Sequence, residues 1–188
     1  MTAMQRGLFL ALLFTSGFSL RLQAQGPPTV VVVVRHAEKA ATPANDPPLT
    51  DAGAARARAL AALLADANVQ SVISTPLLRA RETARPTAEA HGLAIETVAL
   101  AATVSEHAAA VASAVRKHRG KTVLVVGHSN TVAAIIAALG GPRMPDLCDT
   151  QYSNVFTLVL DGPSARLIRG SYGARSPDPA MSCPNGMR

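Results

Sequence analysis

Short runs of β-branched, apolar residues alternate along the chain with longer segments rich in Ala, Leu and Arg. Five consecutive valines occupy residues 30–34, residues 121–126 repeat this pattern, and residues 69–74 form a second short segment rich in Val and Ile. A run that is apolar at every position, rather than at every second one, is typical of a strand buried on both faces of a parallel sheet. The pattern therefore predicts strands at residues 29–35, 69–74 and 121–126.

The segments between these strands have the composition of helices. Strong helix formers fill residues 50–65, and the Thr50 hydroxyl can accept backbone N–H groups at the N-cap. Further helices are predicted at residues 77–90, from Ser105 as the N-cap to residue 118, and from Ser129 to residue 139. Weaker strand signals cover residues 93–100, 154–160 and 165–169. Alternating strands and helices predict an α/β fold, a three-layer sandwich with helices on both faces of a mostly parallel sheet.

Length and charge limit the classes of protein that this chain can be. Its 188 residues suit one compact domain better than two. The formal net charge of +6 raises the question of nucleic acid as a partner. The cations are arginines scattered along the chain, which favours solvated faces and local anion sites over a nucleic-acid footprint. We therefore expect no nucleic-acid partner.

The first 24 residues have the pattern of a signal peptide. Arg6 precedes an apolar stretch at residues 8–14, and Ala24 ends a small-residue cleavage site. We expect residues 25–188 to form the exported, periplasmic or extracellular domain, without stable membrane insertion after cleavage; an uncleaved anchor is the alternative. Export also favours a disulfide between the two cysteines, Cys148 and Cys183, over two separate thiols.

Basic side chains follow three of the predicted strands. Arg35 and His36 follow the first, Arg79 lies just beyond the second, and His128 follows the valine-rich strand at residues 121–126. Parallel strands bring such residues to the same sheet edge, where α/β proteins bind ligands. Arginine forks match the oxygens of a phosphate monoester, and the N–H groups of the helix beginning at Ser129 can add to them. A neutral imidazole can accept a phosphoryl group.

Four ordered motifs carry a resemblance to a known family. Residues 35–39 (Arg-His-Ala-Glu-Lys), 74–84 (Ser-Thr-Pro-Leu-Leu-Arg-Ala-Arg-Glu-Thr-Ala) and 127–131 (Gly-His-Ser-Asn-Thr) resemble the histidine phosphatase (phosphoglycerate mutase-like) superfamily. Residues 49–53 (Leu-Thr-Asp-Ala-Gly) resemble the start of its first helix. The resemblance covers essentially the whole exported domain.

The resemblance implies a phosphatase acting on a small phosphorylated substrate or a phosphoprotein. By it, His36 is transiently phosphorylated, Arg35, Arg79 and His128 bind the phosphoryl group, and neither a metal nor a cofactor is required. The family often has Gly where this chain has Ala37, a change that is tolerable at negative φ. The large mutases carry an Asn and a Trp after the nucleophile that this chain lacks, which argues against mutase activity.

The proton donor is the least determined part of the expected site. Glu106 follows the third strand and can reach the crevice as a general acid, whereas its structural alternative is a glutamate in the first turn of a helix. Glu38 and Lys39 are interpreted as an ion pair within the loop, and Arg56 is expected to face solvent. Small family members resembling phosphohistidine phosphatases lack such an acid, and a good leaving group makes it dispensable.

Two other functions compete with the phosphatase hypothesis. The first is a non-catalytic phosphate-binding module of the same fold. The second is a metal site built from His36, Glu38 and His128, which the adjacent arginines make electrostatically unfavourable.

Overall fold

The structure of the chain is a computed structural model that describes residues 26–162 and 165–177. The predicted signal peptide and Cys183 lie outside these residues, so export and the disulfide stay predictions. Within the described part of the chain, no helix is both long enough and apolar enough to cross a membrane.

Six strands and four helices follow one another in residues 26–162 and 165–177. In chain order they are β1 (Thr29–Arg35), α1 (Asp51–Leu63), β2 (Val69–Ser74), α2 (Leu78–Ala90), β3 (Ile95–Thr97), α3 (Val104–Arg116), β4 (Thr122–Gly127), α4 (Val132–Ala138), β5 (Asn154–Leu160) and β6 (Ala165–Ser171). The strand order in the sheet is β3-β2-β4-β1-β5-β6. The pairs among β1 to β4 are parallel, whereas the β1–β5 and β5–β6 pairs are antiparallel. The predicted α/β class with a mostly parallel sheet is confirmed.

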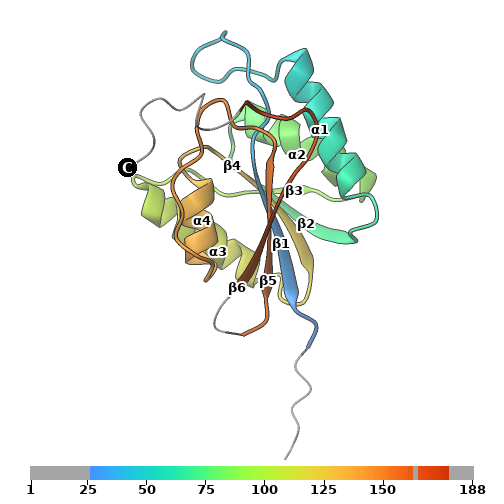
Figure 1. Cartoon of the computed structure of the whole chain (residues 1–188), viewed down its shortest axis with the longest axis vertical. Coiled ribbons are helices and arrows are strands. Elements are labelled where there is room, and N and C mark those ends of the chain that lie inside the picture. Colours follow the sequence, from blue (N-terminus) through green and yellow to red (C-terminus); the bar gives the residue numbers. More distant parts are fainter. Residues whose placement is uncertain (1–25, 163–164, 178–188) are drawn as a thin grey trace, which may run out of the picture.

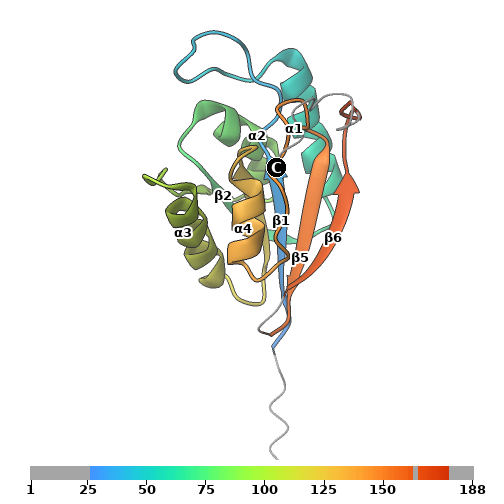
Figure 2. The same ribbon diagram turned by 60° about the vertical axis from the view of Figure 1, so that its left-hand side comes forward.

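The valine run crosses the middle of the sheet and is buried on both faces. Val31 and Val33 belong to the core that contains residues of α3 and α4. Val32 and Val34 belong to the core that contains residues of α1 and α2. Figures 1 and 2 show these two pairs of helices on opposite sides of the strands. Covering both faces is the reason that β1 needs an apolar residue at every position rather than at every second one.

Two helices begin at residues other than those predicted. The N-cap of α3 is Thr103, not Ser105: its hydroxyl accepts the N–H of Glu106, whose carboxylate accepts the N–H of Thr103. This reciprocal capping box needs a glutamate three residues after the cap, which Thr103 has and Ser105 lacks. Helix α4 begins at Val132 rather than at Ser129 because the preceding residues form a turn.

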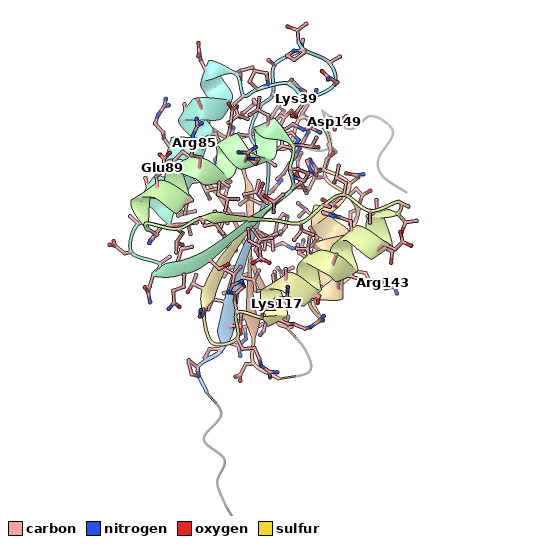
Figure 3. All side chains as sticks on the ribbon, turned by 180° about the vertical axis from the view of Figure 1, so that it is seen from behind. Lys39, Arg85, Glu89, Lys117, Arg143 and Asp149 are labelled. Atoms are coloured by element: carbon pink, nitrogen blue, oxygen red, sulfur yellow. The ribbon has the colours of Figure 1, made fainter. Side chains whose placement is uncertain are left out.

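Four cations form a cluster that contradicts the expectation of scattered charges. Arg116, Lys117, Arg119 and Lys121 lie at the end of α3 and in the turn before β4, at the amino end of the parallel strands. Figure 3 places Lys117 at the end of the molecule opposite Lys39 and Asp149. This basic turn is therefore remote from the sheet edge to which the predicted phosphate ligands belong.

Candidate active site

The two predicted site histidines leave neighbouring parallel strands at the same level. Arg35, the last residue of β1, pairs in register with Gly127, the last residue of β4. The next residue, His36, donates its backbone N–H to the Gly127 carbonyl at 2.9 Å. The imidazole rings of His36 and His128 consequently lie 5.3 Å apart, centroid to centroid. Strand register is thus what brings the two motifs together.

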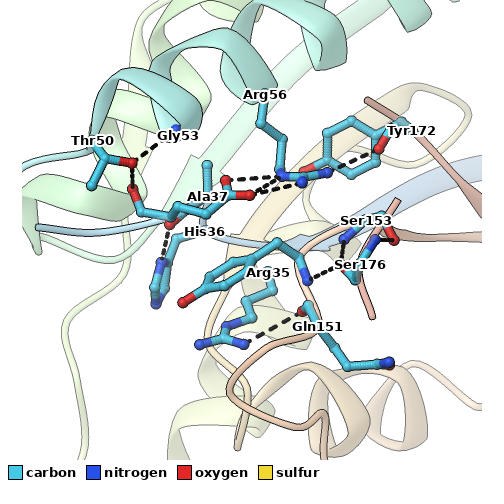
Figure 4. Close-up of polar contacts among 12 residues, drawn as sticks. Arg35, His36, Ala37, Thr50, Gly53, Arg56, Gln151, Ser153, Tyr172 and Ser176 are labelled. Atoms are coloured by element: carbon cyan, nitrogen blue, oxygen red, sulfur yellow. Dashed lines mark hydrogen bonds and ion pairs between the residues drawn. The ribbon is translucent and has the colours of Figure 1, made fainter. Parts of the chain in front are cut away.

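His36 is held as a neutral imidazole with one defined tautomer. Its Nδ1 lies 2.8 Å from the Ala37 carbonyl oxygen, as Figure 4 shows. A carbonyl oxygen can only accept, so Nδ1 carries the proton and Nε2 keeps its lone pair. Burial, reinforced by Arg35, His128 and Arg79, lowers the pKa of His36 to about 3, although the carbonyl contact opposes this shift. Nε2 is therefore a lone-pair nucleophile at neutral pH.

His128 is neutral for similar reasons but has a free donor position. Its Nε2 lies 3.0 Å from the Thr75 hydroxyl. Burial, followed by electrostatic interactions with neighbouring side chains, of which that with Arg79 is the largest, lowers the pKa of His128 to about 4. If Thr75 donates to Nε2, Nδ1 carries the proton, and this buried Nδ1 has no hydrogen-bond partner among the described residues.

Arg35 is clamped by the loop that precedes β5. Its Nη1 donates to the Cys148 carbonyl at 2.8 Å and to the Gln151 carbonyl at 3.4 Å (the latter drawn in Figure 4). Its Nη2 lies 3.4 Å from the carboxylate of Asp149. The ring of Tyr152 covers the guanidinium at 4.1 Å, a distance typical of a cation–π contact. These contacts fix the plane of the guanidinium.

Arg79 projects from the first turn of α2 toward the same edge. Its Nη1 is 3.9 Å from Asp46, and the same carboxylate accepts the N–H of Leu78 at 2.8 Å. Loop 40–48, which carries Asp46, is thereby tied to the start of α2.

Several buried polar atoms of the site have no partner in the protein. Over residues 26–162 and 165–177 they include Arg35 Nε, Arg79 Nε, His107 Nε2 and His128 Nδ1. Buried polar groups in folded proteins are nearly always hydrogen-bonded. Several buried polar groups without a partner at one site therefore indicate that a ligand binds there. Two guanidinium N–H groups and an imidazole N–H match an oxyanion.

Thr83 joins the histidine loop to the arginine helix. Its hydroxyl accepts the Ala37 N–H at 2.9 Å and donates to the Arg79 carbonyl at 2.7 Å. Ala37 does not have a positive φ, because among the described residues Asn68 is the one non-glycine residue that does. The methyl group of Ala37 therefore causes no backbone strain. A single buried hydroxyl thus sets the spacing between His36 and Arg79.

Arg56 is buried, not solvent-facing as predicted, because it pairs with Glu38. Its Nε and Nη2 donate to the Glu38 carboxylate at 2.7 to 3.0 Å, and its Nη1 donates to the Tyr172 carbonyl at 3.0 Å (Figure 4). Burial alone would raise the pKa of Glu38, but the hydrogen bonds and charge of Arg56 outweigh it and hold that pKa below its ordinary value. The Arg56–Glu38 pair anchors the loop after His36. Lys39, which was expected to pair with Glu38, takes no part in this ion pair.

Glu106 lies apart from the four residues that the structure brings together. It is exposed in the first turn of α3, where its carboxylate accepts the Thr103 N–H at 3.1 Å. The metal alternative also lacks a matching arrangement. No group of three or more His, Cys, Asp or Glu side chains in the described ranges could hold a metal ion, and the Glu38 carboxylate is bound by Arg56.

Tyr152 and Asp149 are site residues that the sequence did not indicate. Both belong to the loop between α4 and β5, which has no recognisable motif. Their contacts with Arg35 span more than 110 residues, so only the folded chain places them.

The amino-terminal half of the described chain matches a known family in sequence. The sequence profile described as "Histidine phosphatase superfamily (branch 1)" matches residues 31–101, which contain the first three basic site residues. A segment of 49 residues is 53% identical to the uncharacterized protein Rv0525 of Mycobacterium tuberculosis (strain H37Rv) and covers 26% of this chain. That match spans 24% of the relative's own length.

Solved structures of histidine phosphatases share the fold. The protein histidine phosphatase SixA, complexed with tungstate, superposes with a TM-score of 0.61 at 23% identity over 76% of this chain and 96% of its own. The mycobacterial glucosyl-3-phosphoglycerate phosphatase Rv2419c, in complex with inorganic phosphate, has a TM-score of 0.59 at 19% identity, over 78% of this chain and 97% of its own. The chain thus has the histidine phosphatase fold, and its residues 31–101 are similar in sequence to that superfamily.

Proposed function

We propose that this chain is a histidine phosphatase that hydrolyses a phosphomonoester or a phosphohistidine through a covalent phosphohistidine at His36. The observation that carries the proposal is the position of His36, whose Nδ1 contacts the Ala37 carbonyl, beside three buried donor nitrogens that have no partner among the described residues. Those donors, from Arg35, Arg79 and His128, suit the oxygens of a transferring phosphoryl group. Positioning and charge stabilisation of this kind supply most of the catalysis in phosphoryl transfer.

In the first step, His36 Nε2 attacks the phosphorus atom. The N–P bond forms as the bond between phosphorus and the leaving group breaks, and the leaving group departs with the bonding electron pair. Negative charge on the transferring oxygens is shared among the guanidinium groups and His128. The Ala37 carbonyl stabilises the positive charge that develops on the imidazole, because it accepts from Nδ1.

In the second step, a water oxygen attacks the phosphorus and the N–P bond breaks. Inorganic phosphate leaves with the proton of the water, and His36 returns to its neutral form. No step needs a metal ion, since the arginines supply the positive charge. Because the Glu106 carboxylate is engaged with the Thr103 N–H, the departing leaving group takes its proton from solvent water.

The experiment that tests the proposal is chemical trapping of the intermediate. After rapid acid-free quenching of a reaction with an aryl phosphate, mass spectrometry should locate one acid-labile phosphate on His36. His36→Ala should abolish both the phosphate and turnover. His118→Gln is the matched control, because His118 pairs with Glu96 away from the site and its loss should leave both intact.

The two competing functions give other results in this assay. Saturable phosphate binding without trapping or turnover would establish the non-catalytic binding module instead. Activity that disappears in excess chelator and returns with a divalent metal would contradict metal independence.

We also propose export of the chain and a disulfide between Cys148 and Cys183, on the sequence pattern alone. The intact mass of the protein from an extracellular or periplasmic fraction tests both. A mass lacking residues 1–24 and two hydrogens is expected. A full-length mass with two alkylatable thiols would contradict both proposals.

A further inference from the structure

A cavity opens directly beside the phosphate ligands. Its volume is about 330 Å³, and its lining includes Arg79 and His128 together with residues 100–104 and His107. This volume is at the low end of the range for small-molecule sites, so a compact group fits it. The rest of the lining is mixed: apolar side chains come from Leu77 and most of residues 100–104, and polar ones from Thr103, Asn130 and Thr131. This mixture suits a small group that carries both carbon atoms and hydroxyls next to a phosphate.

His107 presents one unpaired atom in the lining of this cavity. The side chain is 2% exposed, and its Nδ1 lies 3.0 Å from the Ala99 carbonyl oxygen. The carbonyl can only accept, so Nδ1 carries a proton, and in the neutral imidazole Nε2 is then a lone-pair acceptor. Nε2 has no hydrogen-bond partner among residues 26–162 and 165–177.

The catalytic scheme above does not use His107, and the contact with the Ala99 carbonyl accounts for only one of its two ring nitrogens. An unpaired buried acceptor destabilises a protein, and a leucine of similar size would avoid that cost. The cost disappears when a ligand donates to Nε2. A hydroxyl group is the donor that fits, because it is small and neutral, whereas the nearby cations disfavour an ammonium group.

We propose that this cavity binds the organic part of a phosphomonoester and that His107 Nε2 accepts a hydrogen bond from a hydroxyl of that part. The inference rests on the proposed function and narrows its substrate class to small, hydroxylated phosphate esters. His107 is then a specificity-determining residue, and the phosphoryl ligands act on every ester alike. A site built to accept a hydroxyl discriminates strongly against an analogue that lacks it.

The test compares two esters that differ in their hydroxyl groups, glycerol 1-phosphate and propyl phosphate. For the wild-type chain we expect kcat/KM to be at least tenfold higher for glycerol 1-phosphate. His107→Leu should reduce this ratio to below threefold while kcat/KM for propyl phosphate stays within threefold of wild type. His107→Gln, whose amide oxygen can accept, should keep most of the ratio. A ratio unchanged by His107→Leu would overturn the inference.

A second variant keeps the test decisive if replacement of buried His107 prevents folding. Ala102 is exposed at the rim of the cavity, so Ala102→Phe fills the cavity without disturbing the core. It should lower kcat/KM for both esters at least tenfold while the inhibition constant of inorganic phosphate stays unchanged. Wild-type rates for both esters in Ala102→Phe would overturn the inference.

Failure of this inference is distinguishable from failure of the proposed function. Wild-type protein that hydrolyses no phosphate ester and forms no phosphate on His36 would refute the function itself. Phosphate trapped on His36 together with a preference for a phosphohistidine peptide over glycerol 1-phosphate would refute only the hydroxylated substrate class.

Discussion

Acidification should weaken the folded state through the histidines that burial keeps neutral. In the unfolded chain a histidine has a pKa near 6.5, whereas folding lowers the pKa of His36 to about 3. Between these values the unfolded state binds a proton that the folded state excludes. Stability is therefore fully present above pH 6.5 and is lost as the pH falls through 6.5 toward the folded value.

The size of this effect follows from the two pKa values of His36. The limiting slope is about 1.4 kcal/mol per pH unit, and integration from pH 7 to pH 5 gives a loss of about 2 kcal/mol. This is a large fraction of a typical free energy of unfolding, about 5–15 kcal/mol. His128, whose pKa is lowered to about 4, should contribute a similar loss over the same interval.

Urea unfolding of wild type and His36→Gln at pH 7 and pH 5 measures the effect. The free energy of unfolding of wild type should fall by about 2 kcal/mol more than that of His36→Gln, because glutamine does not titrate. The comparison uses the difference between two pH values, so the unrelated cost of the substitution cancels. Equal losses in the two proteins would show that His36 is not held neutral by burial, and the assignment of Nε2 as a lone-pair nucleophile would fail with it.

The remaining predictions concern the residues that hold the site. Arg56→Met should destabilise the chain by about 2 kcal/mol in urea unfolding, because it leaves the partly buried Glu38 carboxylate without its partner, and adding Glu38→Gln should recover part of that loss. Gly53→Ala should lower both stability and turnover despite the better helix propensity of alanine, since its Cβ would clash with the Glu38 carbonyl oxygen. The exposed control Ala52→Gly should lower the free energy of unfolding by about 1 kcal/mol and keep normal turnover. Equal turnover in Gly53→Ala and Ala52→Gly would contradict the clash at Gly53. Tyr152→Leu should raise the inhibition constant of inorganic phosphate severalfold by releasing the guanidinium beneath the ring, and an unchanged constant would show that the ring has no such role.

The sequence by itself determined the sheet and the edge on which the candidate site lies. The valine run could only be a strand covered on both faces, since alternate residues face two different cores. Once the strands are parallel, the residues that follow them must meet, so Arg35, His36 and His128 could be placed together from their positions alone. Local periodicity carries this information because the spacing of apolar residues shows which faces of a strand or helix are buried against other elements.

Tertiary structure decided everything that depends on partners far apart in the chain. Arg56 pairs with Glu38 and reaches the Tyr172 carbonyl, 116 residues away, so its burial leaves no signal in the pattern around it. The clamp on Arg35 by the loop before β5 likewise joins residues more than 110 positions apart. The cavity beside His107 needs α3, the start of α2 and the end of β4 in place at once.

The physical reason for this division is the range over which each kind of information acts. A strand or helix is selected by side chains within a few residues, and its hydrophobic pattern is complete in the local sequence. A buried ion pair, a covered guanidinium or a cavity exists only when separate elements pack, because each part alone would be exposed to water. The sequence therefore determined where a phosphoryl group could bind, and only packing determined how its ligands are held and what can lie beside them.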